Sequence, residues 1–443
     1  DQLRCETATC VIVIQAMTVT LDNLRIHHPA DYAANGYPWA AWDLLREQAP
    51  VFWYERDDVE PFWAVTRYAD VVTVSNHPDV FINGGPRLTL RGKPEPVRAG
   101  MDEFCRERGW DPDEPPDMVF MDNPRHRHMR RLTSWAFTQG AMRRMRAEFE
   151  RLATEFTDDY MARLERSPKP LDFVHELACK LPLAAIGDIL GLEPDDWKRI
   201  LVWSEALVGD IDPDYRRPEE SRGATTYRAM YEMRTYIEAL ITESREHGAA
   251  RGGVIDHMVH TPVQGSLLSD QQLIGYLFLL IGAGNDTTRN ALSGGVAALL
   301  DHPGECERLL ADPTLIPQAV EEILRWTSPV GSFLRTARED FVLAGTRIAA
   351  GDTVGLFYPS ANRDDRVFPD PYRFDITRSP NRHLTFGFGT HFCLGTNLAR
   401  IELQASLKAL LPYLEHIELA GAPVQTHQTH VMGYERLPLR YRA

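Results

Sequence analysis

Phe386-Gly-Phe-Gly-Thr-His-Phe-Cys393-Leu-Gly-Thr-Asn-Leu-Ala-Arg400 is the most informative stretch of this chain. Two glycines within four residues, Gly387 and Gly389, predict a loop that can adopt positive φ. A single cysteine follows this loop, and a helical pattern begins directly after it. A thiol just before a helix N-terminus lies in positive electrostatic potential, which favours the thiolate. Such a sulfur can be a nucleophile, a metal ligand or an idle buried thiol, and the cysteine alone does not distinguish these three.

A second stretch, Tyr276-Leu-Phe-Leu-Leu-Ile-Gly-Ala-Gly-Asn-Asp-Thr-Thr-Arg289, lies inside a long apolar helical pattern. In its middle, Ala283 and Gly284 leave room for a bulky group on one face of the helix. Asp286 and Thr287 place an acid beside a hydroxyl, and burying such groups costs free energy unless they are hydrogen-bonded. A core helix with a satisfied polar kink would show the same pattern.

The composition narrows the class of protein. With 443 residues, 44% of them hydrophobic and 25% charged, the chain is typical of a globular protein, not of a disordered, collagen-like or coiled-coil one. Its 63 acidic against 48 basic residues give a net charge of −15, which argues against nucleic acid or an anionic membrane as partner. No segment approaches the roughly 20 apolar residues of a membrane-spanning helix, so we expect no membrane anchor. Six separated cysteines without a CxxC pair indicate reduced thiols and a cytoplasmic location.

Periodicity predicts a mainly α fold with smaller β regions. Residues 1–16 are interpreted as a leader or disordered N-terminus, and 17–443 as a single catalytic domain. Residues 84–120 begin with a stretch rich in proline and glycine, and we interpret them as a substrate-recognition loop over a binding cavity rather than a domain linker. Strands are expected at 51–54, 62–66, 341–349 and 353–357. Helices are expected at 125–138, 141–166, 173–190, 196–209, 221–246, 269–300, 304–311, 314–327 and 394–413.

The loop at Cys393 resembles a known cofactor site. Its pattern F-x-x-G-x-x-x-C-x-G is similar to the haem-binding loop of the cytochrome P450 family, whose cysteine thiolate is the axial ligand of haem iron. The resemblance implies that Cys393 binds the iron of haem b, and that Phe386, Gly387 and Gly395 contact the cofactor. It also implies a cytochrome P450-like fold, with the haem between a long oxygen-binding helix and the cysteine-bearing loop and helix.

The stretch A-G-x-D-T is similar to the oxygen-binding helix of the same family. By this resemblance, Ala283 and Gly284 contact the haem, while Asp286 and Thr287 are catalytic residues that order water and deliver protons.

Glu322-Ile-Leu-Arg325 places opposite charges at i and i+3 on one helix face, an arrangement that is usually a surface pair worth little. The later segment Pro369-Asp-Pro-Tyr-Arg373-Phe is similar to the arginine-containing segment of the family. The resemblance therefore implies a structural cluster of Glu322, Arg325 and Arg373 that fixes the cysteine-bearing region. Pairing of Glu321 with Arg325 at i and i+4 remains an open alternative.

The two propionates of a haem need cationic or hydrogen-bonding partners when they are partly buried. The family places a His and an Arg four apart on the helix after the long loop, another Arg beyond the E-x-x-R, and a His two residues before the cysteine. This resemblance implies four candidates: His126, Arg130, Arg335 and His391. His128 and Arg131 lie close enough in sequence to compete for the first two roles.

The resemblance implies a haem-thiolate monooxygenase that hydroxylates a hydrophobic small molecule (fatty acyl, terpenoid or steroid) with O2 and two electrons. The string from Asn285 to Asn290 resembles bacterial members that hydroxylate the ends of alkyl chains, methyl-branched lipids or sterol side chains. The chain shows no flavin, nicotinamide or iron–sulfur pattern, so we expect electrons from NAD(P)H through a ferredoxin reductase and a ferredoxin. Basic residues are candidates for steering an acidic partner: Arg130, Arg131, Arg143 and Arg144.

Apolar residues are expected to line the substrate pocket: Leu279, Leu280, Val330, Phe333, Val431 and Met432. Two other classes stay open, a peroxide-driven haem-thiolate enzyme and a non-catalytic haem-binding sensor. The first typically lacks the acid–alcohol pair, and the second needs no roomy cavity.

Overall fold

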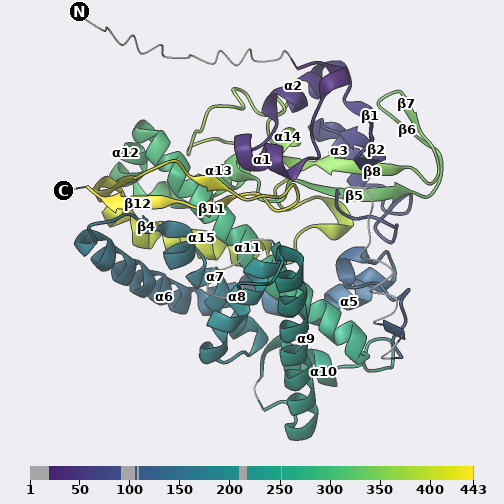
Figure 1. Ribbon diagram of the computed structural model, residues 1–443, viewed down its shortest axis with the longest axis horizontal. Helices are drawn as coiled ribbons and strands as arrows, with labels where there is room; N and C mark the ends of the chain where they lie inside the picture. Colours follow the sequence, from purple (N-terminus) through teal and green to yellow (C-terminus); the bar gives the residue numbers. More distant parts are fainter. Residues whose placement is uncertain (1–18, 91–104, 107–108, 209–216, 251, 443) are drawn as a thin grey trace, which may run out of the picture.

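A computed structural model of the chain describes residues 19–90, 105–106, 109–208, 217–250 and 252–442. Helices predominate, and the strands lie in the upper part of the view in Figure 1, in one group at the right and another at the left, which confirms the predicted mainly α class. The predicted leader at 1–16 and parts 91–104 and 107–108 of the predicted recognition loop lie outside the described residues. The interpretation of 17–443 as one catalytic domain stays a prediction.

A five-stranded sheet forms the β-rich side, with the strand order β1-β2-β8-β5-β3. β2 and β8 are parallel, and the other neighbouring pairs are antiparallel. All positions of β8 are buried, as a central strand covered on both faces requires. The strands are β1 (Val51–Arg56), β2 (Val59–Val65), β3 (Phe81–Ile82), β5 (Ser332–Ala337) and β8 (Thr353–Phe357).

Short helices pack against this sheet. Trp42 and Leu45 of one of them are fully buried in a cluster with Tyr54, Phe62 and Phe357 of the strands. This packing explains why such short helices are stable here, because isolated helices of this length are marginal in water. They are α1 (Pro29–Asn35), α2 (Trp39–Gln48), α3 (Tyr68–Ser75) and α14 (Tyr358–Ala361).

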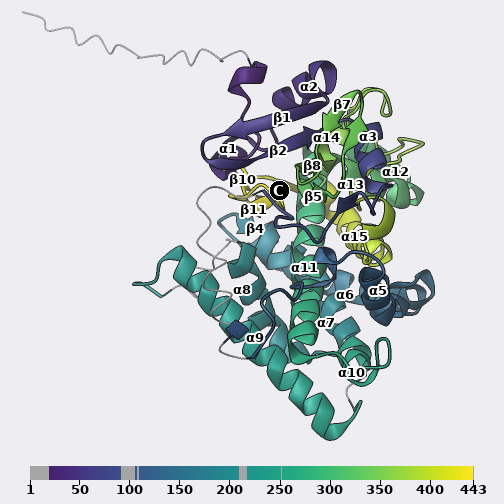
Figure 2. The same cartoon turned by 90° about the vertical axis from the view of Figure 1, so that its right-hand side faces the viewer.

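The larger part of the molecule is helical and is arranged around α11 (Asp270–Asp301), which runs through its middle (Figure 2). A capping box of Ser269 and Gln272 begins this helix, and His302 with Pro303 ends it. No helix in the described ranges is both long enough and apolar enough to cross a membrane. The other helices are α5 (Arg125–Ser134), α6 (Gln139–Arg166), α7 (Lys180–Leu190), α8 (Trp197–Val208), α9 (Arg222–His247), α10 (Gly253–His260), α12 (Pro303–Ala311), α13 (Ile316–Thr327) and α15 (Thr396–Leu410).

Three small sheets complete the fold. One has the order β4-β12-β9, and the other two pair β10 with β11 and β6 with β7. Their strands are β4 (Leu171–Asp172), β6 (Phe341–Leu343), β7 (Thr346–Ile348), β9 (Ile417–Leu419), β10 (Val424–Gln425), β11 (Tyr434–Arg436) and β12 (Pro438–Tyr441).

The long helices lie where periodicity predicts them, with three revisions at their ends. The predicted helix 125–138 is α5 followed by the 3-10 helix η3 (Trp135–Phe137), and 173–190 is the π-helix η4 (Val174–Ala178) followed by α7. The predicted helix 394–413 begins only at Thr396, three residues after the cysteine. The predicted strand 341–349 is the β6–β7 hairpin. The sequence analysis did not predict α1, α2, α3, α10 or β5.

Candidate active site

The cysteine loop is closed by short-range hydrogen bonds between backbone groups. Gly387 and Gly389 both have φ of 72°, as the sequence predicts. The N–H of Cys393 donates to the carbonyl of Phe386 at 2.9 Å, which brings the ends of the loop together. A side chain at Gly389 would also meet the carbonyl of Ser75, at 2.4 Å from its Cβ, so the packing of α3 requires glycine here as much as φ does.

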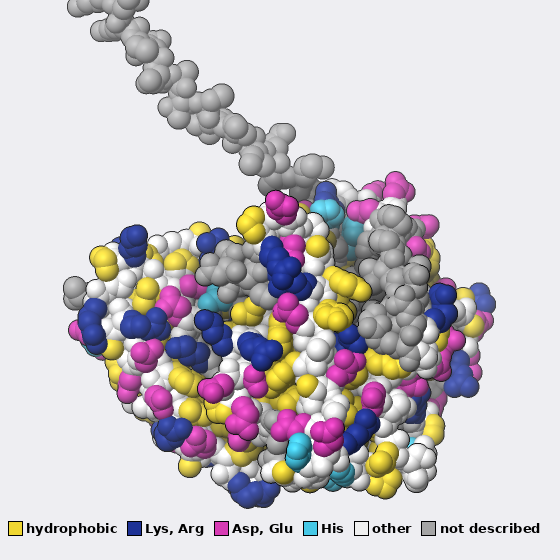
Figure 3. Space-filling model, turned by 60° about the horizontal axis from the view of Figure 1, so that its bottom comes forward, with side chains coloured by type: hydrophobic (Ala, Val, Ile, Leu, Met, Phe, Trp, Pro, Cys, Tyr) yellow, Lys and Arg dark blue, Asp and Glu magenta, His cyan; other side chains and the backbone are white. Residues whose placement is uncertain are grey.

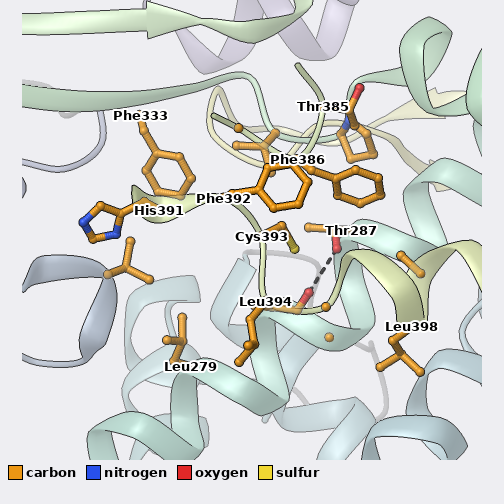
Figure 4. A pocket seen from close by; sticks show the side chains of 18 of the residues that line it. Leu279, Thr287, Phe333, Thr385, Phe386, His391, Phe392, Cys393, Leu394 and Leu398 are labelled. Atoms are coloured by element: carbon orange, nitrogen blue, oxygen red, sulfur yellow. Dashed lines mark hydrogen bonds between the residues drawn. The ribbon is translucent and has the colours of Figure 1, made fainter. Parts of the chain in front are cut away.

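Cys393 lies at the wall of a cavity, with its sulfur and the Thr287 hydroxyl facing the same space (Figure 4). Burial raises the pKa of this thiol, and the N–H of Gly395 and the charges of Arg130 and Arg400 oppose that shift. Burial thus opposes the thiolate, whereas the N–H of Gly395 at the helix start favours it, in the direction expected from sequence. A coordinating metal ion deprotonates a thiol outright, so thiolate formation and metal binding are coupled at this position.

The cavity encloses about 1440 Å³ of empty space, part of which opens to solvent. Its walls come from α11, from the cysteine loop and the start of α15, and from segments around Met118, Ile186 and Phe333. No Asp or Glu is among the described residues that line it. Four of the predicted substrate-pocket residues line it: Leu279, Leu280, Val330 and Phe333.

The two other predicted pocket residues do not line the cavity. Val431 is joined to Val330 by an antiparallel β-bridge. Met432 is buried in the cluster around Trp42. The assignment of these two residues to the substrate pocket stays a prediction.

All four predicted propionate partners line the cavity. The rings of His126 and His391 lie 4.1 Å apart between centroids, and Arg335 is buried beside them. Burial and neighbouring cations lower the pKa of His126 to about 4 and of His391 to about 2. Nδ1 of His126 is buried without a hydrogen-bond partner. The competing candidates, His128 and Arg131, are not among the lining residues.

Two guanidinium groups, those of Arg130 and Arg335, line this apolar cavity without a lining carboxylate, so an anion bound beside them would balance their charge. A haem fits this set, since its two propionates supply the negative charge and its flat ring the apolar surface. His126, Arg130, Arg335 and His391 would hold the propionates, and Cys393 the iron.

The middle of α11 is open toward the cavity at Ala283, as predicted. The Thr287 hydroxyl donates to the carbonyl of Ala283 at 3.0 Å, which satisfies it inside the helix (Figure 4). At Gly284, a Cβ would lie 3.0 Å from the Ile186 side chain, so the close approach of α7 also favours glycine at this position.

Asp286 does not share this face with Thr287. Its side chain is 3% exposed, and its Oδ1 lies 3.6 Å from Nη2 of Arg289, which is also buried. Asn285 donates to the same carboxylate oxygen at 3.4 Å. The structure thus brings the hydroxyl to the cavity and leaves the acid behind the helix.

The predicted cluster around Glu322 forms, with one different member. Glu322 and Arg325 are fully buried and joined by two hydrogen bonds of 2.8 Å. The second arginine is Arg378, whose Nε donates to Glu322 at 3.2 Å. The prediction of Arg373 is wrong: its side chain is exposed, and only its carbonyl takes part, as an acceptor from Arg325 and Arg378.

The sequence analysis also missed other contacts of this region. Asn381 donates to Glu322 at 3.0 Å, and no sequence signal marked either Asn381 or Arg378. Glu321, the open alternative for Arg325, pairs instead with Arg400. Arg400 lies only seven residues after Cys393 in the sequence. This separation was the one signal that could have marked Arg400 as a residue of the site.

Comparisons with known proteins agree with this geometry. The family model of cytochrome P450 matches residues 202–434. The chain is 34% identical over 411 residues to a methyl-branched lipid omega-hydroxylase of Mycobacterium tuberculosis, with 90% of each chain covered. It is 34% identical over 412 residues to a steroid C26-monooxygenase of Mycolicibacterium smegmatis, covering 92% of this chain and 94% of the relative. A Mycobacterium marinum cytochrome P450 in complex with pseudoionone superimposes with a TM-score of 0.83 at 33% identity, covering 96% of this chain and 100% of that one.

The fold and the site define a haem-thiolate oxygenase, in which a cysteine loop and a long helix enclose one cavity. The chain belongs to the cytochrome P450 family. It is a monooxygenase that acts on a hydrophobic substrate, and the family implies haem iron as cofactor and a redox partner as electron source.

Proposed function

We propose that this cytochrome P450 hydroxylates the end of a methyl-branched hydrocarbon chain, such as that of a fatty acyl, terpenoid or steroid side chain. The observation that carries the proposal is the apolar part of the cavity wall, formed by Leu279, Leu280, Val330 and Phe333, in a cavity whose described lining holds no carboxylate. The relatives named for a methyl-branched lipid and for steroid C26 support the same substrate class. An apolar chain gains about 25 cal/mol for each Å² buried in such a wall, so it can bind without a polar anchor.

When bound, the haem would supply the oxygen chemistry, and a thiolate ligand would donate electron density to its iron. Cys393 would hold the iron, and the basic residues around His126 and Arg335 would hold the propionates. The apolar walls exclude water from the substrate. Thr287 places a hydroxyl at the cavity, where it can position a proton donor. Asp286 is the buried acid that would resupply this donor with protons.

Electrons are proposed to come from NAD(P)H through a ferredoxin reductase and a ferredoxin. Arg131, in the last turn of α5, and Arg143 and Arg144, near the start of α6, are exposed, and α6 packs against α15, which follows the cysteine loop. Arg130 lines the cavity and is not part of this surface. The chain carries a net charge of −15, but this charge does not make the surface uniformly negative. On the face seen in Figure 3, basic side chains are interspersed with acidic ones, so a small group of exposed arginines is compatible with the net charge. Among the described residues, Cys105, Cys179, Cys306 and Cys393 are thiols and not disulfides, in keeping with the proposed cytoplasmic location.

The iron ligand is tested by Cys393→Ser in the haem-loaded protein. The unmodified protein should give the ferrous–carbon monoxide band typical of thiolate ligation, and the variant should lose it. The matched control is Cys179→Ser, because Cys179 is also a buried thiol but donates to the carbonyl of His175 at 3.0 Å. Loss of the band in the control alone, or its retention in Cys393→Ser, contradicts the assignment.

The substrate class is tested by titrating the haem-loaded protein with methyl-branched fatty acids, acyclic terpenoids, sterols and small polar compounds. Displacement of iron-bound water, read from the haem absorption shift, should occur with the apolar compounds. Turnover with ferredoxin, its reductase and NAD(P)H should then add one oxygen atom at a terminal carbon, read by mass spectrometry. A shift produced only by the small polar compounds rules the proposal out.

A further inference from the structure

A second charged pair lies beside the buried Glu322 cluster. Glu321 of α13 accepts from Arg400 of α15 in a bidentate arrangement, with Nε–Oε1 at 2.6 Å and Nη2–Oε2 at 2.9 Å. Nε2 of His383 lies 3.2 Å from the same carboxylate. Both charged side chains are about one-third exposed or less, so solvent screens the pair incompletely. Burial opposes ionisation, but the hydrogen bonds from Arg400 and His383 lower the pKa of Glu321 to about 2.

The pair is fixed to the loop that carries the proposed iron ligand. Nη1 of Arg400 donates to Oγ1 of Thr396 at 2.6 Å, at the first residue of α15. The guanidinium lies over the ring of Phe386, with 4.7 Å from Cζ to the ring centroid. Phe386 lines the cavity, and its carbonyl accepts the N–H of Cys393. The charge of Arg400 is among those that act on the Cys393 sulfur.

We propose that Glu321 is the counter-ion that balances Arg400 beneath the cysteine loop, and that this balance sets the reduction potential of the bound haem. The inference rests on the proposed haem–thiolate function and assigns Arg400 and Glu321 as positioning residues, not catalytic ones. Reduction of the iron adds one negative charge to the haem–thiolate unit. A nearby cation therefore favours the reduced form, and a nearby anion favours the oxidised form. With both residues ionised and paired, the two effects largely cancel.

The two single variants must then act in opposite directions. Glu321→Gln leaves the positive charge of Arg400 without its counter-ion and raises the potential. Arg400→Gln leaves the negative charge of Glu321 and lowers it. At an effective dielectric constant of about 20, each change should alter the equilibrium constant for one-electron reduction by about threefold to tenfold. A tenfold change corresponds to about 59 mV for one electron. The double variant should return to within about threefold of the unmodified protein.

The test is a dye-mediated spectroelectrochemical titration of the substrate-free, haem-loaded protein at mildly alkaline pH, so that Glu321 stays ionised. Each variant is first checked for the thiolate-type ferrous–carbon monoxide band. Lys408→Gln is the matched control: it removes one charge from the same helix, but Lys408 is 63% exposed and pairs with Glu150 of α6. Its potential should stay within about threefold of the unmodified protein.

Opposite shifts in the single variants, with recovery in the double variant, support the inference. Shifts in the same direction, or shifts no larger than that of the control, overturn it while leaving the haem–thiolate function intact. If a single variant fails to load haem, Arg400→Lys and the double variant decide, since both preserve the charge balance. A shift of more than about threefold in either one also overturns the inference. Absence of the thiolate-type band in the unmodified protein instead refutes the proposed function.

Discussion

Arg378→Ala should destabilise the protein strongly, whereas Arg373→Ala should not, although only Arg373 belongs to the sequence motif. The Arg378 side chain is 8% exposed and donates to Glu322 at 3.2 Å. It also donates to the carbonyls of Pro369 at 2.7 Å and Arg373 at 2.9 Å. A hydrogen bond to a charged group contributes roughly 1.5–3 kcal/mol, and removing one partner of a buried charge costs about 3–5 kcal/mol.

We therefore expect Arg378→Ala to lower the free energy of unfolding by about 3–5 kcal/mol, mainly because Glu322 loses part of its compensation inside the protein. Arg373→Ala removes an exposed side chain and keeps the backbone carbonyl that accepts from Arg325 and Arg378, so its cost should stay within about 0.5 kcal/mol.

The measurement is urea unfolding of the haem-loaded protein followed by circular dichroism, with haem absorbance recorded in parallel. Arg378→Ala should also release haem at lower urea concentration, because the cluster borders the segment that leads to the cysteine. Equal losses of stability in the two variants would refute the placement of Arg378, and so would a loss below about 1 kcal/mol for Arg378→Ala.

Three further results are expected. Thr287→Ala should lower the product formed per NAD(P)H consumed by on the order of tenfold, since it removes a positioned proton donor; Thr287→Ser should preserve coupling, and full coupling in the alanine variant contradicts the role. Burial raises the pKa of Glu402 from 4.5 to about 8, so the folded state keeps a proton that the unfolded chain releases. The free energy of unfolding should therefore fall by up to about 1.4 kcal/mol per unit between about pH 4.5 and 8, and Glu402→Gln should remove this slope in urea titrations; an unchanged slope argues against a neutral Glu402. The double charge reversal of Arg131→Glu and Arg144→Glu should slow ferredoxin-driven turnover at low salt at least tenfold, whereas exposed Lys198→Glu should not; equal rates would remove these arginines from the proposed partner surface.

Part of the site could be predicted because the conformation of its two main motifs depends on consecutive residues. The two glycines before Cys393 adopt the positive φ that their sequence predicts, and they do so within one short loop. The apolar run around Ala283 is long enough to make α11 certain from periodicity alone. Both motifs carry their conformation in consecutive residues, so neither depends on a distant partner for its recognition.

Other elements depend on partners far away in sequence. β5 was not predicted because its six residues are a strand only between β8 and β3, which supply its hydrogen bonds. α2 and α3 are likewise short and gain their stability from packing on the sheet. Val431 lies beside Val330 through a β-bridge, and no pattern in either segment indicates this pairing.

The sequence by itself determined the cysteine loop, the open middle of α11 and the positions of the basic residues around the cavity. Only the tertiary structure decided that Asp286 lies behind the helix beside Arg289, that Arg378 takes the place of Arg373, and that Glu321 balances the charge of Arg400. Glycine content and periodicity fix backbone conformation over a few neighbouring residues. A charged side chain, in contrast, pairs with whichever opposite charge the folded chain brings within hydrogen-bond distance, as for Glu321 and Arg400, which are 79 residues apart in sequence.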